Sequence, residues 1–71
     1  MDIRKKVGIN LRKLREAKGW SQEQLAFETG LHRTYISGIE RGVRNPTVLV
    51  LETIASRMGI DISELVGREP S

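Results

Sequence analysis

Polar side chains stand on the outer side of a short predicted helix at about residues 33–41. Ile36 and Ile39 lie three positions apart and form the inner side of that helix. The outward positions are then those of Arg33, Thr34, Ser37 and Gly38. A helix that projects from a compact body fits the major groove of DNA, which is wide enough to admit one. The pattern therefore predicts recognition through a helix surface.

Catalysis is not indicated by the rest of the sequence. The chain has no cysteine and a single histidine, His32, so neither a thiolate site nor a cluster of metal ligands is expected. No nucleophile–base arrangement or paired-carboxylate site is recognisable, and 71 residues in short helices leave little room for a deep pocket. We expect a binding protein and not an enzyme, with no cofactor, metal or small-molecule ligand.

Positive charge is concentrated in the N-terminal part of the chain. Residues 1–44 contain ten Lys or Arg and five Asp or Glu, for a net charge of +5, and residues 45–71 contain two and four, for −2. A basic portion favours a polyanionic partner, although solvated basic faces are also common in helical domains. No apolar run approaches the roughly 20 residues that span a bilayer, and the N-terminus lacks the apolar stretch of a secretory signal. A cytoplasmic protein is expected.

The first two of five predicted helices are defined by an apolar stripe and a cap. The first helix spans about Ile3 to Lys18. Its stripe consists of Ile3, Val7, Leu11 and Leu14. The second helix follows Ser21, which forms a capping-box pattern with Gln24. It ends at Gly30, because glycine accepts the left-handed conformation of a tight turn.

The remaining helices complete the predicted core. The polar helix spans about Arg33 to Arg41, and a fourth helix starts near Thr47, which is a suitable N-cap. The buried stripe of the fourth helix is expected to contain Val48, Leu51, Ile54, Ala55 and Met58. A short fifth helix at about Ser63 to Val66 completes one all-α domain over residues 1–67. Residues 68–71 are expected to form a frayed tail.

Four stretches of the chain carry a family resemblance. They are residues 19–26 (GWSQEQLA), Gly30-Leu31, residues 35–42 (YISGIERG) and residues 44–47 (RNPT). In these four stretches the chain resembles the Cro/cI-type (XRE) helix-turn-helix family of phage and bacterial regulators. The resemblance implies a compact five-helix, lambda-repressor-like domain with the helix-turn-helix at its second and third helices. Residues 33–42 and the short length further resemble the controller proteins of restriction–modification systems, although other standalone regulators share much of this string.

The resemblance implies a sequence-specific transcriptional regulator that binds a palindromic double-stranded DNA operator as a homodimer. The DNA-contacting residues would be Gln22, His32, Arg33, Thr34, Tyr35, Ser37, Arg44 and Asn45. Arg33 and Thr34 would reach base edges in the major groove. Gln22 would bind a phosphate at the N-terminus of the second helix. Arg44 and Asn45 would bind phosphates from the loop after the third helix.

Alternative roles remain open at several of these positions. Tyr35 either packs its ring over the sugar-phosphate backbone or shields the core, and Asn45 alternatively only shapes its turn. Arg33 alternatively binds a phosphate. His32 stands where the family usually has a Ser or Asp cap, so either the cap is weaker or His32 faces a phosphate. Gly38 replaces the long polar side chain of other family members, which favours readout of DNA shape there.

Two further contacts are expected within and between protomers. The resemblance places Arg15 and Glu40 as a partly buried ion pair between the first and third helices, with a role in orientation more than in stability. Four apolar residues would form a two-fold dimer contact, since neighbouring exposed apolar residues indicate an interface. They are Leu49, Val50, Ile62 and Val66. Scattered apolar residues at the surface are the alternative interpretation.

Two other functions compete with DNA binding by a complete regulator. One is an antitoxin-like or other protein-interaction helix-turn-helix module, against which the outward-facing Arg33 and the loop residue Arg44 favour DNA. The other is the DNA-binding head of a larger regulator, although Met1 and the end at Ser71 favour a complete chain. The sequence leaves open whether binding activates or represses. Activation would need a contact with RNA polymerase, which the sequence does not locate.

Overall fold

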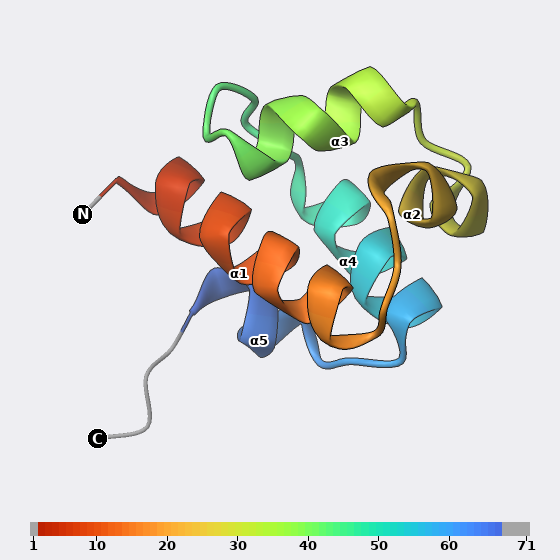
Figure 1. Cartoon of the computed structure of the whole chain (residues 1–71). Coiled ribbons are helices and arrows are strands. Elements are labelled where there is room, and N and C mark those ends of the chain that lie inside the picture. The colour runs from red at the N-terminus through yellow and green to blue at the C-terminus, as the bar shows by residue number, and fades with distance from the viewer. Residues whose placement is uncertain (1, 68–71) are drawn as a thin grey trace.

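The computed structural model describes residues 2–67, which contain five helices joined by short loops (Figure 1). Their bounds are α1 (Ile3–Ala17), α2 (Gln22–Thr29), α3 (Arg33–Glu40), α4 (Val48–Met58) and α5 (Ile62–Val66). The predicted all-α fold is confirmed, and each predicted helix agrees to within one residue at its ends. The tail expected at residues 68–71 lies outside the described residues. None of the described helices combines the length and the apolar character needed to cross a membrane.

Side-chain caps fix where the helices begin. Ser21 Oγ accepts a hydrogen bond from the Gln24 backbone N–H at 3.0 Å, and Thr47 caps α4 in the same way. The capping box predicted at Ser21 is wrong in its second half, because within residues 2–67 the Ser21 backbone N–H donates no hydrogen bond to the Gln24 side chain. The Gln24 amide is directed to Glu28 instead, with Nε2 donating to Glu28 Oε2 at 2.8 Å. A complete capping box is found at the start of α5.

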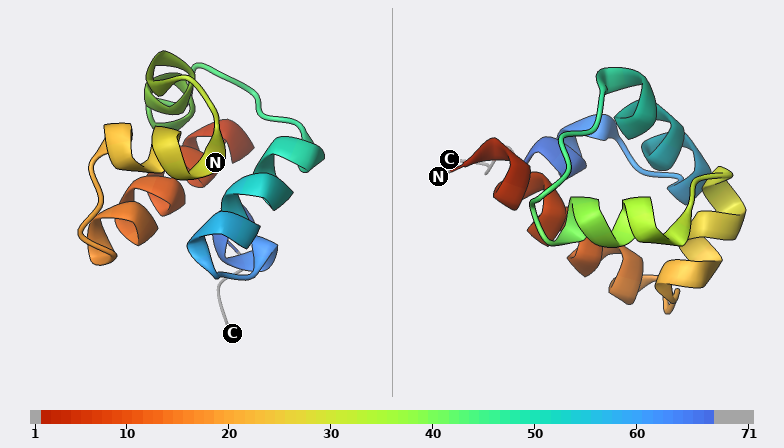
Figure 2. Two further views of the ribbon diagram at one scale, coloured as in Figure 1. Left: turned by 90° about the vertical axis from the view of Figure 1, so that its right-hand side faces the viewer. Right: turned by 90° about the horizontal axis from the view of Figure 1, so that it is seen from above.

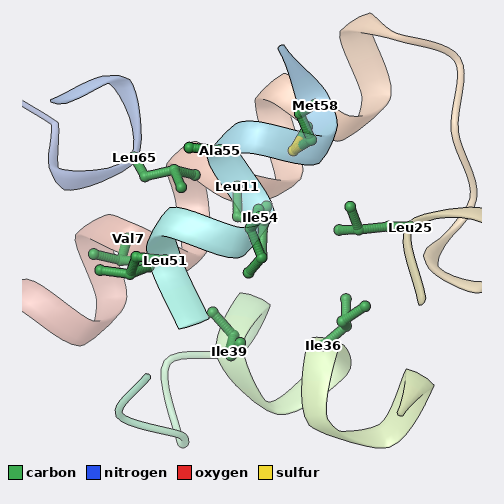
Figure 3. Close-up of a cluster of buried hydrophobic side chains, with 10 residues drawn as sticks. All are labelled: Val7, Leu11, Leu25, Ile36, Ile39, Leu51, Ile54, Ala55, Met58 and Leu65. Atoms are coloured by element: carbon green, nitrogen blue, oxygen red, sulfur yellow. The ribbon is translucent and has the colours of Figure 1, made fainter. Parts of the chain in front are cut away.

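All five helices contribute to one apolar core (Figure 3). The buried side chains are Val7, Leu11, Leu25, Ile36, Ile39, Leu51, Ile54, Ala55, Met58 and Leu65. Full burial of a Leu or Ile side chain stabilises a fold by about 1.5–3 kcal/mol relative to exposure. A chain this short has few such side chains and no cysteine for a disulfide, so its stability depends on this cluster. Ile36 and Ile39 are completely buried, which fixes the outer side of α3.

Three apolar residues are placed differently from the prediction. Ile3 is 56% exposed and Val48 is 70% exposed, although the periodicity predicts a buried stripe for each. Each is the first residue of its helix and lies beyond the turns that pack on the core. Val50, expected at the surface, is half-buried and packs against the core. Helical periodicity gives the direction of a side chain, but it does not say whether another element reaches that side chain.

A close approach of two backbones joins α1 to α3. A Cβ atom added at Gly8 would lie 2.6 Å from the carbonyl oxygen of Glu40 and would also overlap the carbonyl oxygen of Ile39. Only glycine therefore fits between the middle of α1 and the C-terminal end of α3. Gly8 is not among the residues that the sequence patterns above single out. A glycine inside an otherwise regular helical pattern was the available signal.

α3 lies at one side of the molecule, with α1 and α2 as its supports (Figure 1). A tight turn joins α2 to α3, and Gly30 adopts the left-handed conformation there, with φ of 74°. Seen from above, α3 runs across the near side of the molecule, in front of α1 (Figure 2). The helix-turn-helix thus places the side of α3 opposite Ile36 and Ile39 toward solvent.

Gly8→Ala is expected to destabilise the protein. Overpacking against backbone atoms costs about 1–3 kcal/mol, which outweighs the gain of at most about 1 kcal/mol in helix propensity. Urea unfolding followed by circular dichroism measures the difference. Lys13→Ala is the control, because Lys13 lies on the exposed side of α1 opposite Gly8. A Gly8→Ala midpoint at or above that of Lys13→Ala would contradict the close approach.

Candidate nucleic-acid interface

The outer side of α3 carries the polar residues that the sequence assigned to it. Arg33 and Thr34 are exposed, and Ser37 is half-buried one turn further along the helix. Tyr35 is half-buried and packs against the core, so at least part of its ring shields apolar side chains. Because Ile36 is completely buried on the inner side, the orientation of this polar surface is fixed by the core.

His32 begins α3 without the usual side-chain cap. Its backbone is extended, with φ −71° and ψ 142°, and within residues 2–67 its side chain makes no capping hydrogen bond. The His32 carbonyl oxygen accepts from the N–H groups of Tyr35 and Ile36, both at 3.1 Å, as the first turn closes. The imidazole is exposed at the N-terminal end of α3. Of the two alternatives that the sequence leaves open for His32, the weaker cap agrees with the structure, and the phosphate contact stays a prediction.

Gln22 contacts another side chain of the protein. Its Nε2 donates to Glu40 Oε1 at 3.0 Å, which links the first residue of α2 to the last residue of α3. A primary amide has two N–H donors and an acceptor oxygen. One N–H is directed inward by Glu40, and within residues 2–67 the other has no acceptor. The phosphate contact expected of Gln22 stays a prediction.

Arg15 and Glu40 form a buried ion pair. Arg15 Nε and Nη2 donate to the two Glu40 carboxylate oxygens at 2.7 and 3.1 Å, and Arg15 Nη1 donates to the Trp20 carbonyl oxygen at 2.7 Å. The two charged side chains are only 10% and 4% exposed. The hydrogen bonds to Glu40 raise the pKa of Arg15 above its usual value. With Gln22, the pair connects α1, α2 and α3.

The sequence predicted that position 38 faces open solvent, and the structure shows that it does not. It is buried, because the side chain of Arg44 lies over it: a Cβ at Gly38 would overlap Arg44 Cγ and would lie 3.5 Å from Arg44 Cβ and Cδ. The Gly38 carbonyl oxygen also accepts from the backbone N–H groups of Val43 and Arg44, at 3.0 and 3.1 Å. The loop after α3 therefore folds back onto the polar side of the helix. Asn45 follows in that loop and is exposed.

Basic residues outside the predicted set lie near the same loop. Lys5 on α1 packs at Gly42, where an added Cβ would lie 3.0 Å from Lys5 Cγ. Lys5 and Arg41 are both exposed. Neither residue was predicted individually, although the charge excess of residues 1–44 pointed to this part of the chain. Among residues 2–67, no three His, Cys, Asp or Glu side chains are grouped closely enough to hold a metal ion.

The four residues predicted for a dimer contact differ in exposure and location. Leu49 is 79% exposed and borders a shallow depression on the outer side of α4. Ile62 is half-buried and lines an adjoining depression, which shares Glu52 and Ser56 with the first. Val66, 37% exposed, lines a separate depression beside the start of α1, and Val50 packs against the core. The structure therefore brings Leu49 and Ile62 to one surface and places Val66 elsewhere.

The turn between α2 and α3 and the exposed polar side of α3 define a helix-turn-helix protein. The chain belongs to the Helix-turn-helix family, whose model matches residues 11–65. The matched residues include both helices of the motif, the turn at Gly30, all of α4, α1 from Leu11 onward and α5 up to Leu65.

Proteins of one kind recur among the relatives. Control protein C.BamHI from Bacillus amyloliquefaciens is 46% identical over 66 residues, covering 92% of this chain and 82% of that protein. Control protein C.SmaI from Serratia marcescens is 41% identical over 69 residues, covering 97% and 82%. The crystal structure of the restriction–modification controller protein C.AhdI from Aeromonas hydrophila has a TM-score of 0.84 and 47% identity, covering 87% of this chain and 94% of that one. The predicted resemblance to controller proteins is confirmed.

Glu40→Ala is expected to destabilise the protein strongly. Removal of one partner of a buried ion pair leaves Arg15 uncompensated, at a cost of about 3–5 kcal/mol. Glu16→Ala is the matched control, because it breaks the exposed Arg12–Glu16 pair (3.2 Å), and exposed pairs contribute about 1 kcal/mol or less. Thermal unfolding compares the two. Equal melting temperatures for Glu40→Ala and the wild type would rule out the structural role of the pair.

Proposed function

We propose that the protein is a sequence-specific, double-stranded DNA-binding transcriptional regulator that places α3 in the major groove. The observation that carries the proposal is the exposed polar side of α3 on a rigid support. Arg33 and Thr34 face solvent, while Ile36 and Ile39 hold the opposite side in the core. An α-helix fits the width of the major groove, and its outward side chains then reach base edges.

Polar and basic side chains around α3 supply the contacts to the DNA backbone in this proposal. Arg44 and Asn45 extend from the loop at the C-terminal end of α3, and Gln22 lies at the N-terminus of α2. Backbone N–H groups and the dipole at a helix N-terminus favour a phosphate. Phosphate contacts fix the position of the protein on the duplex, whereas Arg33, by bidentate bonding to a guanine, supplies sequence discrimination.

The regulator acts as a homodimer on a palindromic operator in our proposal. Val48 and Leu49 are 70% and 79% exposed at the start of α4, and neighbouring exposed apolar side chains favour an interface. A two-fold axis at this surface would present two copies of α3 to half-sites about one helical turn apart. Dimerisation would also add stability to a fold with a small core.

Control of a restriction–modification system is the role that the relatives support best. The relatives from Bacillus amyloliquefaciens and Serratia marcescens are control proteins, and the similar solved structure is that of a restriction–modification controller protein. We propose the same role for this chain, in the cytoplasm and through binding without catalysis. Contact with RNA polymerase would be needed if the bound protein activates transcription.

Selection of bound duplexes from a random pool, at two salt concentrations, tests the proposed function. An enriched palindrome is expected, with an affinity that falls steeply as salt rises because counterions are released from the DNA. Arg33→Ala should then weaken binding to the selected duplex about tenfold or more and relax the preference at one base pair in each half-site. Lys13→Ala, on the exposed side of α1, is the control. Absence of any enriched sequence would contradict the proposal.

Leu49→Glu is expected to produce a monomer with weakened operator binding. A carboxylate in an apolar contact would have to be desolvated without a partner in both copies. Sedimentation velocity measures the association state. Ala17→Glu, a change at the exposed C-terminal residue of α1, adds the same charge outside the proposed contact. A Leu49→Glu variant that sediments as a dimer would show that the two copies meet at another surface.

A protein-interaction module is the second candidate, and one observation favours it. Phe27 on α2 is 81% exposed, which is unusual for an aromatic side chain of this size. The selection experiment separates the two functions. A module that binds only proteins would recover no enriched duplex at either salt concentration.

A further inference from the structure

We infer that Gly38 is a positioning residue for DNA recognition, because its missing side chain lets Arg44 lie on the polar side of α3. This inference rests on the proposed function, in which Arg44 contacts DNA, and it explains why the Arg44 side chain lies where it does. Gly38 itself presents no functional group. Its contribution is the space that it leaves and the backbone oxygen that it offers.

The first support is the packing of Arg44 on the helix. Arg44 Cβ and Cδ each lie 3.5 Å from the position of a Cβ at residue 38, and Arg44 Cγ would overlap that atom. Arg44 Cγ therefore occupies the volume that a Cβ at position 38 would fill, and the carbons on either side of it are at van der Waals contact distance. Gly38 is buried for this reason, although it stands on the outer side of α3.

The second support is the backbone of the loop. The Gly38 carbonyl oxygen accepts hydrogen bonds from the N–H groups of both Val43 and Arg44, at 3.0 and 3.1 Å. These bonds bring the backbone of residue 44 back beside the helix that residue 38 belongs to. The aliphatic part of Arg44 then lies across Gly38, and long basic side chains commonly pack their stems in this way while the charged end stays in water. Arg44 as a whole remains exposed.

Side-chain order is the physical consequence. A free Arg side chain loses much rotamer entropy when it is fixed on binding. Contact of the aliphatic part of Arg44 with Gly38 restricts the side chain before DNA binds. The same contact keeps the guanidinium close to the polar side of α3, so that it does not extend freely into solvent. A methyl group at position 38 would displace the aliphatic part of the Arg44 side chain. The protein would keep the positive charge of Arg44, but the guanidinium would no longer be held in one position.

A double-mutant cycle on duplex binding tests the inference. The four proteins are the wild type, Gly38→Ala, Arg44→Ala and the double variant, with the selected duplex as the probe. Each single variant is expected to bind about tenfold more weakly, because a tenfold change corresponds to about 1.4 kcal/mol, which is close to the contribution of a hydrogen bond to a charged group such as a phosphate. Gly38→Ala should change affinity less than about twofold in the Arg44→Ala background, because the group that it positions is already absent. The slope of log K against log salt should fall by about 0.9 for each phosphate that the protein no longer binds, in both single variants.

Three outcomes would overturn the inference. Wild-type affinity in Gly38→Ala, or an equal loss of affinity in both backgrounds, would show that Gly38 does not act through Arg44. Failure of the wild type to bind any duplex would refute the proposed function and this inference together, so the two failures are distinguishable. Gly38→Ala is expected to keep its helical spectrum, since alanine favours a helix over glycine.

One further measurement does not depend on any variant folding. A nuclear Overhauser effect between the Gly38 Hα and Arg44 Hγ protons of the wild-type protein is expected, and its absence would show that the stem does not lie on the helix.

Discussion

The C-terminal end of α3 is held against α1 by two contacts, and the rest of the molecule depends on them. The first is the close approach at Gly8, where a Cβ would meet the Glu40 carbonyl oxygen at 2.6 Å. The second is the buried pair of Arg15 with the Glu40 carboxylate, at 2.7 and 3.1 Å. A buried carboxylate must be paired or it destabilises the fold. The ion pair therefore fixes the orientation of α3 relative to α1, while Gly8 fixes the distance between the two helices. Gln22 joins the same carboxylate and adds α2 to the arrangement.

A recognition surface follows from this arrangement. The inner side of α3 is fixed by completely buried Ile36 and Ile39, so the polar side cannot rotate without exposing these two side chains. Arg33 and Thr34 project from that fixed side, and the loop returns Arg44 to it over Gly38. A surface that is ordered before binding avoids part of the entropic cost of association. Short helices with a small core can therefore present a defined set of donors to DNA.

Local sequence signals were enough to predict the fold, but they were not enough to predict every contact of the site. Apolar periodicity and the caps at Ser21 and Thr47 indicated the helices, because both signals act within one element. The Arg15–Glu40 pair came from the family resemblance and not from spacing. Three contacts could not be predicted in this way, because each involves a residue from another element or loop. They are the hydrogen bond of Gln22 to Glu40, the close approach of Gly8 to α3 and the packing of Arg44 on Gly38. Periodicity also misplaced Val48 and Val50, since it does not reveal where neighbouring elements end.

The proposed recognition requires that α3 meets DNA with its polar side while the buried core beneath it stays unchanged. Titration of ¹⁵N-labelled protein with a duplex selected for binding tests this requirement residue by residue. We predict large amide shift changes at Arg33, Thr34, Ser37 and Arg44, with small changes at buried Leu11 and Ile54. Changes centred on Phe27 or on α5, with α3 unaffected, would contradict it.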